Sequence, residues 1–129
     1  MKILFAAFAA IVISCPCYGQ SSELLDAIKQ VESGGRDIDG DGGAAIGPYQ
    51  IHRAYWQDAV RINPSIGGSY SDCHGEAYAR IVVKTYLGHY GRGKSTESMA
   101  RIHNGGPKGH LRSATIKYWT KIEKELNRG

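Results

Sequence analysis

Cysteine is scarce in this chain of 129 residues, which has three, and two of them stand close to the N-terminus. If the N-terminal segment is removed, Cys15 and Cys17 leave with it and Cys73 remains alone. A secreted chain with one cysteine cannot close an internal disulfide, and it cannot chelate a metal through a cysteine cluster. We therefore expect a domain that is stabilised by its hydrophobic core.

The chain also lacks a large charge of one sign, internal repeats and low-complexity tracts. It has 16 Lys and Arg against 12 Asp and Glu, which gives a net charge of +4. The hydrophobic fraction is 42% and the charged fraction 22%, a balance typical of one globular domain and not of a disordered chain. Because the cations are scattered instead of forming a stripe, we expect no nucleic-acid partner.

One long apolar run is present, and it lies at the N-terminus. Lys2 precedes an apolar stretch over residues 3–13, and small and polar residues follow up to Gly19. The run is too short to span a bilayer and matches a secretory signal peptide over residues 1–19, with cleavage after Gly19. We expect a secreted or extracytoplasmic protein, without stable membrane insertion, whose domain covers residues 20–129. A lipoprotein anchored through Cys15 is the alternative, which Pro16 directly after it disfavours.

The remaining chain is mainly helical by its periodicity. A first helix is predicted between an N-cap at Ser21-Ser22 and a stop at Gly34-Gly35. Further helices are predicted over residues 54–62, 74–90 and 95–103, and a last helix is predicted after an N-cap at Ser113. The glycine-rich stretch 35–47 has room for short strands. The inward residues that we expect in the two later long helices are Ala77, Ile81, Tyr86 and Leu87, and Ile116, Trp119, Ile122 and Leu126.

Glu32 stands in the last turn of the first predicted helix, whose apolar face carries Leu25, Ile28 and Val31. The negative end of the helix dipole and apolar neighbours both disfavour the charged carboxylate, so we expect the pKa of Glu32 to be raised. A raised pKa suits a general acid at neutral pH. The alternative is an exposed glutamate at a helix end.

Three further carboxylates, Asp37, Asp39 and Asp41, follow in the loop. A protonated donor and an ionised partner are the minimum equipment for hydrolysis of a glycosidic bond. Two of the three aspartates are expected only to solvate the turn. The spacing also resembles the start of an EF-hand calcium loop, but Pro48 stands where the bidentate glutamate is required, so we expect no metal ion.

Five stretches of the chain resemble, in order, the invertebrate-type lysozymes of the destabilase family. They are VESG at 31–34, GPYQI at 47–51, YWQD at 55–58, ARIHNGGPKG at 100–109 and YW at 118–119. Together they extend over nearly all of the chain after the predicted signal peptide. The family's animal members are rich in disulfides, from which this sequence departs.

The resemblance implies an α+β, lysozyme-like fold that is mainly helical with a small β-hairpin region. It implies a bacteriolytic, antimicrobial glycoside hydrolase that cleaves the β-1,4 bond between N-acetylmuramic acid and N-acetylglucosamine in peptidoglycan, without a cofactor. The family's catalytic glutamate matches Glu32, and its aspartate matches Asp41, with Asp39 open as the second choice. The positions that match cleft-lining residues of the family are Tyr49, Gln50, His103 and Asn104.

Two other functions fit the same residues. A lytic transglycosylase needs Glu32 alone and forms an anhydro product, and a glycan-binding module on this fold needs no acid at all. We expect peptidoglycan glycan strands as the partner and a monomeric protein.

Overall fold

The structure is a computed structural model that describes residues 21–128, so the predicted signal peptide lies outside the described residues. It is mainly helical with one small sheet, which confirms the expected α+β class. The main elements are α1 (Ser22–Ser33), β1 (Asp39–Gly40), β2 (Ala45–Ile46), β3 (Ile51–His52), α2 (Arg53–Ile62), α3 (Glu76–Tyr90), α4 (Thr96–Gly105) and α5 (Ile116–Leu126). Short 3₁₀ turns join them: η1 (Asp41–Gly43), η2 (Pro64–Ile66), η3 (Tyr70–His74), η4 (Gly109–Leu111) and η5 (Ser113–Thr115).

Capping residues set most helix ends where the sequence placed them. The Ser21 hydroxyl accepts the Leu24 amide at 3.1 Å, and Gly34 ends α1 in the left-handed conformation with φ 66°. The predicted cap at Ser113 is wrong, because residues 113–115 form a 3₁₀ turn and α5 begins after Thr115. The Thr115 hydroxyl does not cap α5 either, since it donates to the Gly109 carbonyl at 2.7 Å.

The sheet is antiparallel in the order β1-β2-β3, with Asp39 opposite Ile46 and Ala45 opposite His52. The side chain of Gln50 links the residue before β1 to the turn after β2. Its amide donates to the carbonyls of Ile38 at 2.7 Å and Gly47 at 3.0 Å. A Cβ at Gly40 would lie 2.0 Å from Oε1 of Gln50, so a glycine is needed there. The two-residue strands thus hold a defined register with the help of a half-buried side chain.

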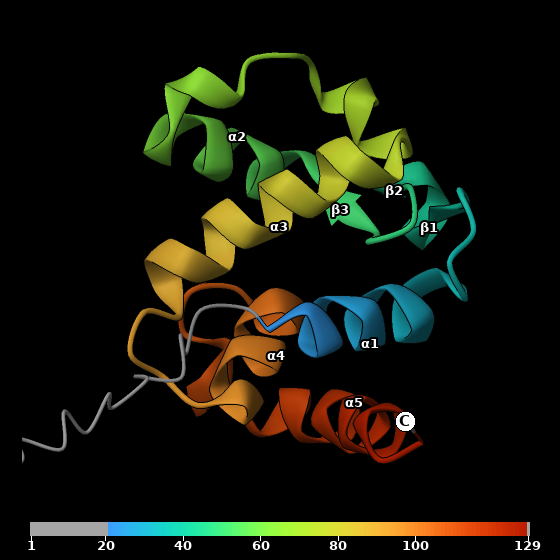
Figure 1. Ribbon diagram of the computed structural model, residues 1–129, viewed down its shortest axis with the longest axis vertical. Helices are drawn as coiled ribbons and strands as arrows, with labels where there is room; N and C mark the ends of the chain where they lie inside the picture. Colours follow the sequence, from blue (N-terminus) through green and yellow to red (C-terminus); the bar gives the residue numbers. More distant parts are fainter. Residues whose placement is uncertain (1–20, 129) are drawn as a thin grey trace, which may run out of the picture.

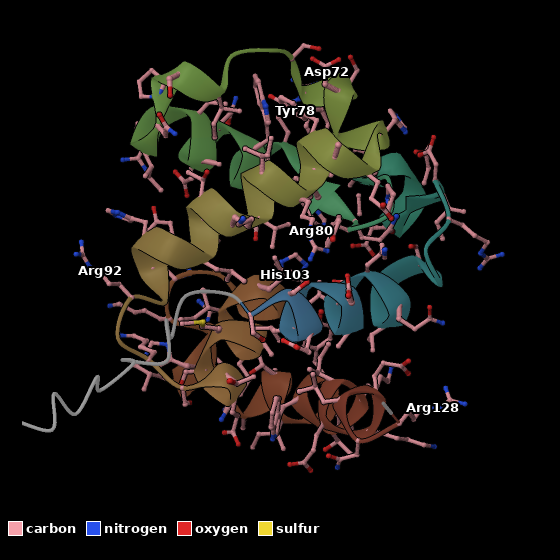
Figure 2. All side chains as sticks on the ribbon, in the orientation of Figure 1. Asp72, Tyr78, Arg80, Arg92, His103 and Arg128 are labelled. Carbon is pink, nitrogen blue, oxygen red and sulfur yellow. The ribbon has the colours of Figure 1, made fainter. Side chains whose placement is uncertain are left out.

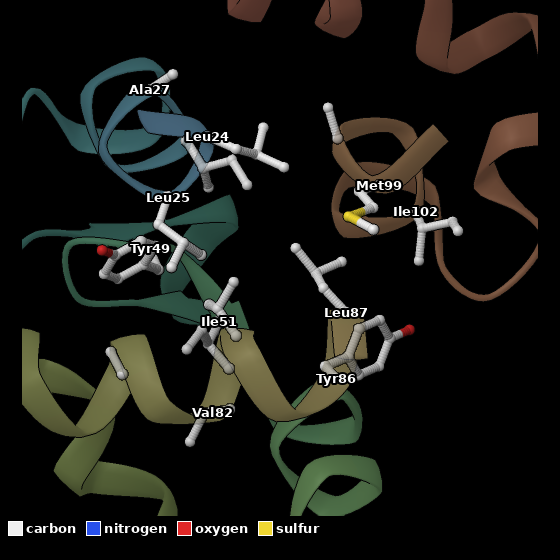
Figure 3. Close-up of a cluster of buried hydrophobic side chains, with 14 of the residues drawn as sticks. Leu24, Leu25, Ala27, Tyr49, Ile51, Val82, Tyr86, Leu87, Met99 and Ile102 are labelled. Carbon is white, nitrogen blue, oxygen red and sulfur yellow. The ribbon is translucent and has the colours of Figure 1, made fainter. Parts of the chain in front are cut away.

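The hydrophobic core forms between α1, α3, α4 and the sheet (Figure 3). Its largest fully buried side chains include Leu24, Leu25, Ile28, Tyr49, Ile51, Val82, Val83, Leu87, Met99 and Ile102. Two expected inward positions of α3 are wrong, because Ala77 is exposed and Ile81 is 50% exposed. In α5 the buried residues are Tyr118 and Ile122, whereas Ile116 is 50% exposed. The apolar pattern found both helices and most of their inward residues, since Tyr86, Leu87 and Ile122 are buried and Trp119 and Leu126 pack against the core.

Cys73 is buried in this core as a free thiol. Burial raises its pKa to about 12, so the thiol stays protonated at neutral pH. A protonated, buried cysteine behaves as a small apolar side chain and is not a nucleophile. The described domain therefore holds its fold without a disulfide between residues 21–128.

The helices form two groups, one of α2 and α3 and the other of α1, α4 and α5 (Figure 1). α2 packs on α3, next to the sheet, while α5 packs on both α1 and α4. Between residues 21 and 128 no helix is long and apolar enough to cross a bilayer. The C-terminal ends of α1 and α4 and the sheet come together, and that junction holds the candidate site.

Candidate active site

A pocket of about 180 Å³ lies where the C-terminal ends of α1 and α4 meet the sheet. The residues that line it are Glu32, Asp41, Ala45, Gln50, His52, His103 and Asn104. Five of the six site residues predicted from the sequence are among them, although they come from three separate stretches of the chain. Tyr49 is the exception.

Glu32 lies on the helical wall of this pocket. Its side chain is 19% exposed, and Nε2 of His103, a residue whose side chain is 2% exposed, lies 3.1 Å from Oε2 of Glu32. The Tyr118 hydroxyl donates to the same Oε2 at 3.2 Å. Both contacts are made to one carboxyl oxygen, so they fix the orientation of the group and leave Oε1 engaged by neither residue.

The other ring nitrogen of His103, Nδ1, lies 2.9 Å from the hydroxyl of Tyr55. Burial raises the pKa of Tyr55 well above its ordinary value, so the phenol keeps its proton. If that proton is donated to Nδ1, the neutral imidazole carries its own proton on Nε2 and donates it to Glu32. Tyr55 stacks on Tyr86 at 3.7 Å between ring centroids, which keeps the phenol in place. Figure 2 shows His103 in the interior beside α1.

Local sequence explains why Glu32 meets the sheet. Gly34 ends α1 directly after Ser33, whose hydroxyl donates to the Pro48 carbonyl at 2.7 Å and accepts the Gly35 amide at 3.1 Å. These bonds tie the end of the helix to the turn that precedes β3. The VESG and GPYQI stretches thus form one structural unit, although more than ten residues separate them.

Asp41 lies on the opposite wall, in a different environment. Its side chain is 70% exposed, and Nε2 of His52 lies 3.0 Å from its Oδ2. Its backbone is left-handed, with φ 49°, and Gln50 has φ 51°. These are the two non-glycine residues with positive φ between residues 21 and 128, and both line this pocket. Such backbone conformations cost free energy and are typical of functional sites.

The other two loop aspartates face away from this pocket, toward His74. Nδ1 of His74 lies 2.7 Å from Oδ1 of Asp37 and 4.0 Å from Oδ1 of Asp39. The hydrogen bond to Asp37 raises the pKa of His74. The loop therefore divides its carboxylates, and Asp41 alone of the three lines the pocket with Glu32. Among residues 21–128, no three His, Cys, Asp or Glu side chains are grouped as a metal site requires.

Tyr49, predicted to contact substrate, does not line the pocket. Its side chain is fully buried and lies beside Leu25 and Ile51 in the core (Figure 3). Nη1 of Arg80 donates to its hydroxyl at 2.9 Å. Tyr49 thus supports the turn that carries Gln50 and does not reach this pocket.

Three residues of the site were not found from the sequence: His52, Tyr55 and Tyr118. Tyr55 and Tyr118 belong to the YWQD and YW stretches, so the motifs contained them without showing what they contact. Burial, and next the charge of Glu32, raise the pKa of Tyr118 well above its ordinary value. Its position on an amphipathic helix gave no sign that its hydroxyl would reach a carboxylate on another helix.

Comparison with known proteins identifies relatives of this chain. The destabilase family model matches residues 21–125. A lysozyme of Magallana gigas is 36% identical over 110 residues, covering 81% of this chain and 80% of the relative. Invertebrate-type lysozyme 6 of Caenorhabditis elegans is 34% identical over 117 residues, covering 80% and 85%. The crystal structure of the inhibitor-bound lysozyme from Meretrix lusoria superposes with a TM-score of 0.69 at 35% identity, covering 81% of this chain and 88% of that one.

Proposed function

The chain belongs to the destabilase family of invertebrate-type lysozymes, and on that premise we propose that it is a secreted muramidase. Family and fold make it a lysozyme-type glycoside hydrolase. The bond that it hydrolyses in this proposal is the β-1,4 linkage between N-acetylmuramic acid and N-acetylglucosamine in bacterial peptidoglycan. Residues 1–19 serve as the signal peptide, and residues 20–129 form the mature domain.

The observation that carries the proposed mechanism is the pairing of two unlike carboxyl groups in one pocket. Glu32 is mostly buried beside the hydrogen-bonding side chains of His103 and Tyr118, and Asp41 is largely hydrated. Glycoside hydrolysis needs a carboxylic acid that protonates the leaving oxygen and an ionised carboxylate that attacks or stabilises the oxocarbenium ion. In this mechanism Glu32 is the acid and Asp41 the nucleophile or stabiliser.

The neighbours of Glu32 support its role as a proton donor. His103 and Tyr118 both contact Oε2, so in the acid form the proton belongs on Oε1. After the proton has gone to the leaving oxygen, the same two donors stabilise the resulting carboxylate. His103 and Tyr118 act as positioning residues here. This changes the role of His103 from the substrate contact that the resemblance implied.

The two amides of the pocket suit a sugar substrate. Gln50 and Asn104 line the pocket from opposite sides, one before β3 and one near the end of α4. Sugar hydroxyl and acetamido groups are neutral donors and acceptors, which amides recognise without a charge. We assign Gln50 and Asn104 to substrate binding.

Mass spectrometry of the fragments released from purified peptidoglycan tests the proposed function. The mature protein should release fragments that end in a reducing N-acetylmuramic acid, and the Glu32→Gln protein should release none. Anhydro ends in place of reducing ends would identify a lytic transglycosylase. Binding without release by the wild-type protein would identify a glycan-binding module.

A further inference from the structure

A second pocket adjoins the catalytic one at His52. It has a volume of about 370 Å³ and is lined by Gly43, Ala44, His52, Arg53, Ala54 and Tyr70. His52 lines both pockets, and Ala44 in the second pocket is followed by Ala45 in the first. A polymeric substrate that occupies the catalytic pocket therefore has a neighbouring site one side chain away.

Arg53 is the charged residue of this second pocket, and its side chain rests on a fixed aromatic ring. The guanidinium carbon lies 4.5 Å from the centroid of Tyr70. Tyr70 is anchored to the sheet, because its hydroxyl donates to the Ile51 carbonyl at 2.6 Å. Stacking on a ring face restrains the guanidinium and leaves the N–H groups at its edge free for a ligand.

Arg53 also differs from most other arginines in its lack of an acidic partner. Four arginines of the described chain form ion pairs, in the pairs Asp58–Arg61, Asp26–Arg80, Glu97–Arg101 and Glu125–Arg128. Arg53 forms none with a carboxylate of residues 21–128, and its neighbour His52 is occupied by Asp41. A restrained cation beside an active site, without an internal partner, is available to an anion from outside.

We propose that the second pocket is a substrate subsite in which Arg53 binds a carboxylate of the glycan polymer. The inference rests on the proposed muramidase function and specifies its substrate. Peptidoglycan carries carboxylates on the peptides attached to muramic acid and on the lactyl groups that bear no peptide, whereas chitin carries none. A planar guanidinium is the side chain best shaped to bind a carboxylate through two parallel hydrogen bonds. Arg53 is then a specificity residue that favours the acidic polymer.

Equilibrium binding to immobilised peptidoglycan tests this subsite without depending on cleavage. All proteins carry Glu32→Gln, so that no polymer is consumed. Arg53→Gln is compared with Arg53→Lys and with Arg92→Gln, a control that removes the same charge from the turn after α3, where Arg92 points away from the molecule (Figure 2). The polymer is presented intact, with its carboxylates converted to amides, or with its peptides removed by an amidase.

Arg53→Gln should weaken binding to the intact polymer about fivefold, the upper range for a partly exposed ion pair, and Arg53→Lys should recover part of the loss. On the amidated polymer, the ratio between the two Kd values should fall to about one. Arg92→Gln should change Kd less than twofold on every polymer. The amidase removes the peptide carboxylates and frees the lactyl ones, so a ratio that survives peptide removal shows that Arg53 binds the lactyl carboxylate, and one that disappears assigns its carboxylate to the peptide.

Equal losses for Arg53→Gln and Arg92→Gln would overturn the subsite, since net charge would then explain both. A loss of the same size on the amidated polymer, or the absence of any binding to the intact one, would overturn it as well. Failure of the proposed function would be seen by mass spectrometry, if the protein with Glu32 intact released no fragments from peptidoglycan. The two failures are therefore distinguishable.

Discussion

The two walls of the proposed catalytic pocket position their carboxyl groups in different ways. On the helical wall, Glu32 is enclosed by His103 and Tyr118, which come from two other helices. On the sheet wall, Asp41 stands on a left-handed loop residue, largely in water, with His52 as its neighbour. One carboxyl group is positioned by packing and the other by backbone conformation.

This difference suits the two roles that a glycosidase must assign. A group that has to carry a proton needs neutral surroundings and fixed donors, and a group that has to stay ionised needs water and a polar neighbour. A change on the helical wall therefore removes a whole network of contacts, whereas a change on the sheet wall acts on one exposed side chain. Substitutions on the two walls should therefore differ in how far their effects extend.

The largest effect is expected from Glu32→Gln. An amide cannot donate the proton that the leaving oxygen needs, so kcat on peptidoglycan should fall by about 1000-fold. The melting temperature should stay within a few degrees, because the amide fills the same space. Glu123→Gln, on the exposed face of α5, is the matched control and should keep full activity. More than about a tenth of the wild-type activity in Glu32→Gln would remove this residue from the mechanism.

The next effect is expected from Asp41→Asn, which removes the ionised carboxylate of the sheet wall. Loss of one preorganised electrostatic group in an active site costs about a hundredfold in kcat, and we expect that loss here. Asp37→Asn and Asp39→Asn should stay within about threefold, since both side chains face His74. An inactive Asp39→Asn with an active Asp41→Asn would exchange the roles of these two residues. Full activity in all three would favour a transglycosylase that uses Glu32 alone.

Tyr118→Phe should lower kcat about tenfold with little change in KM. The substitution keeps the ring and removes one of the two hydrogen bonds to Oε2 of Glu32, a contribution of about 1.5 kcal/mol for a bond to a charged group. Tyr78→Phe is the control, because the Tyr78 hydroxyl donates to the Gly67 carbonyl, outside this pocket. Equal activities of the two variants would show that Tyr118 only fills space.

The aromatic surroundings of Glu32 predict a loss of stability at high pH. Burial raises the pKa of Tyr55, Tyr86 and Tyr118 in the folded protein. In the unfolded chain a tyrosine loses its proton near pH ~10, so above that pH the folded state binds more protons and the free energy of unfolding falls. Each such tyrosine contributes a slope of about 1.4 kcal/mol per pH unit. Urea unfolding between pH 8 and 11.5 should show this decline, and Tyr118→Phe should flatten it by the share of one tyrosine.

The smallest effect is expected outside the pocket, at the pair formed by Asp37 and His74. The hydrogen bond to Asp37 raises the pKa of His74, so its stabilisation is complete below the unfolded value of ~6.5 and is lost as pH rises through the folded value. Because the pair is exposed, we expect a gain below about 1 kcal/mol. The difference in melting temperature between wild type and His74→Gln should therefore be small at pH 5.5 and vanish at pH 8.5. A difference that grows with pH would contradict this sign.

The sequence alone determined most of the helices and singled out Glu32 as the candidate acid. Capping residues such as Ser21 and Gly34 act on backbone groups within one turn, so their effect can be read locally. The VESG stretch located Glu32 at the end of such a helix, and the family resemblance gave the fold. The cysteine count indicated a core without an internal disulfide, as residues 21–128 show.

Tertiary structure decided what each side chain contacts. Asp37, Asp39 and Asp41 are equivalent by composition and spacing, and only the position of His74 on one side and of the pocket on the other separates them. Tyr49 and Gln50 are adjacent, yet Tyr49 is buried in the core and Gln50, which has a left-handed backbone, lines the pocket.

The partners of Glu32 were beyond sequence reasoning for the same reason. Tyr55, His103 and Tyr118 lie on three different helices, and their contacts join residues separated by 48 to 86 positions in the chain. Periodicity and capping describe forces that act within a helical turn, whereas these hydrogen bonds exist only once the helices pack. The sequence therefore determined which carboxyl group could be the acid, and packing decided how that group is held.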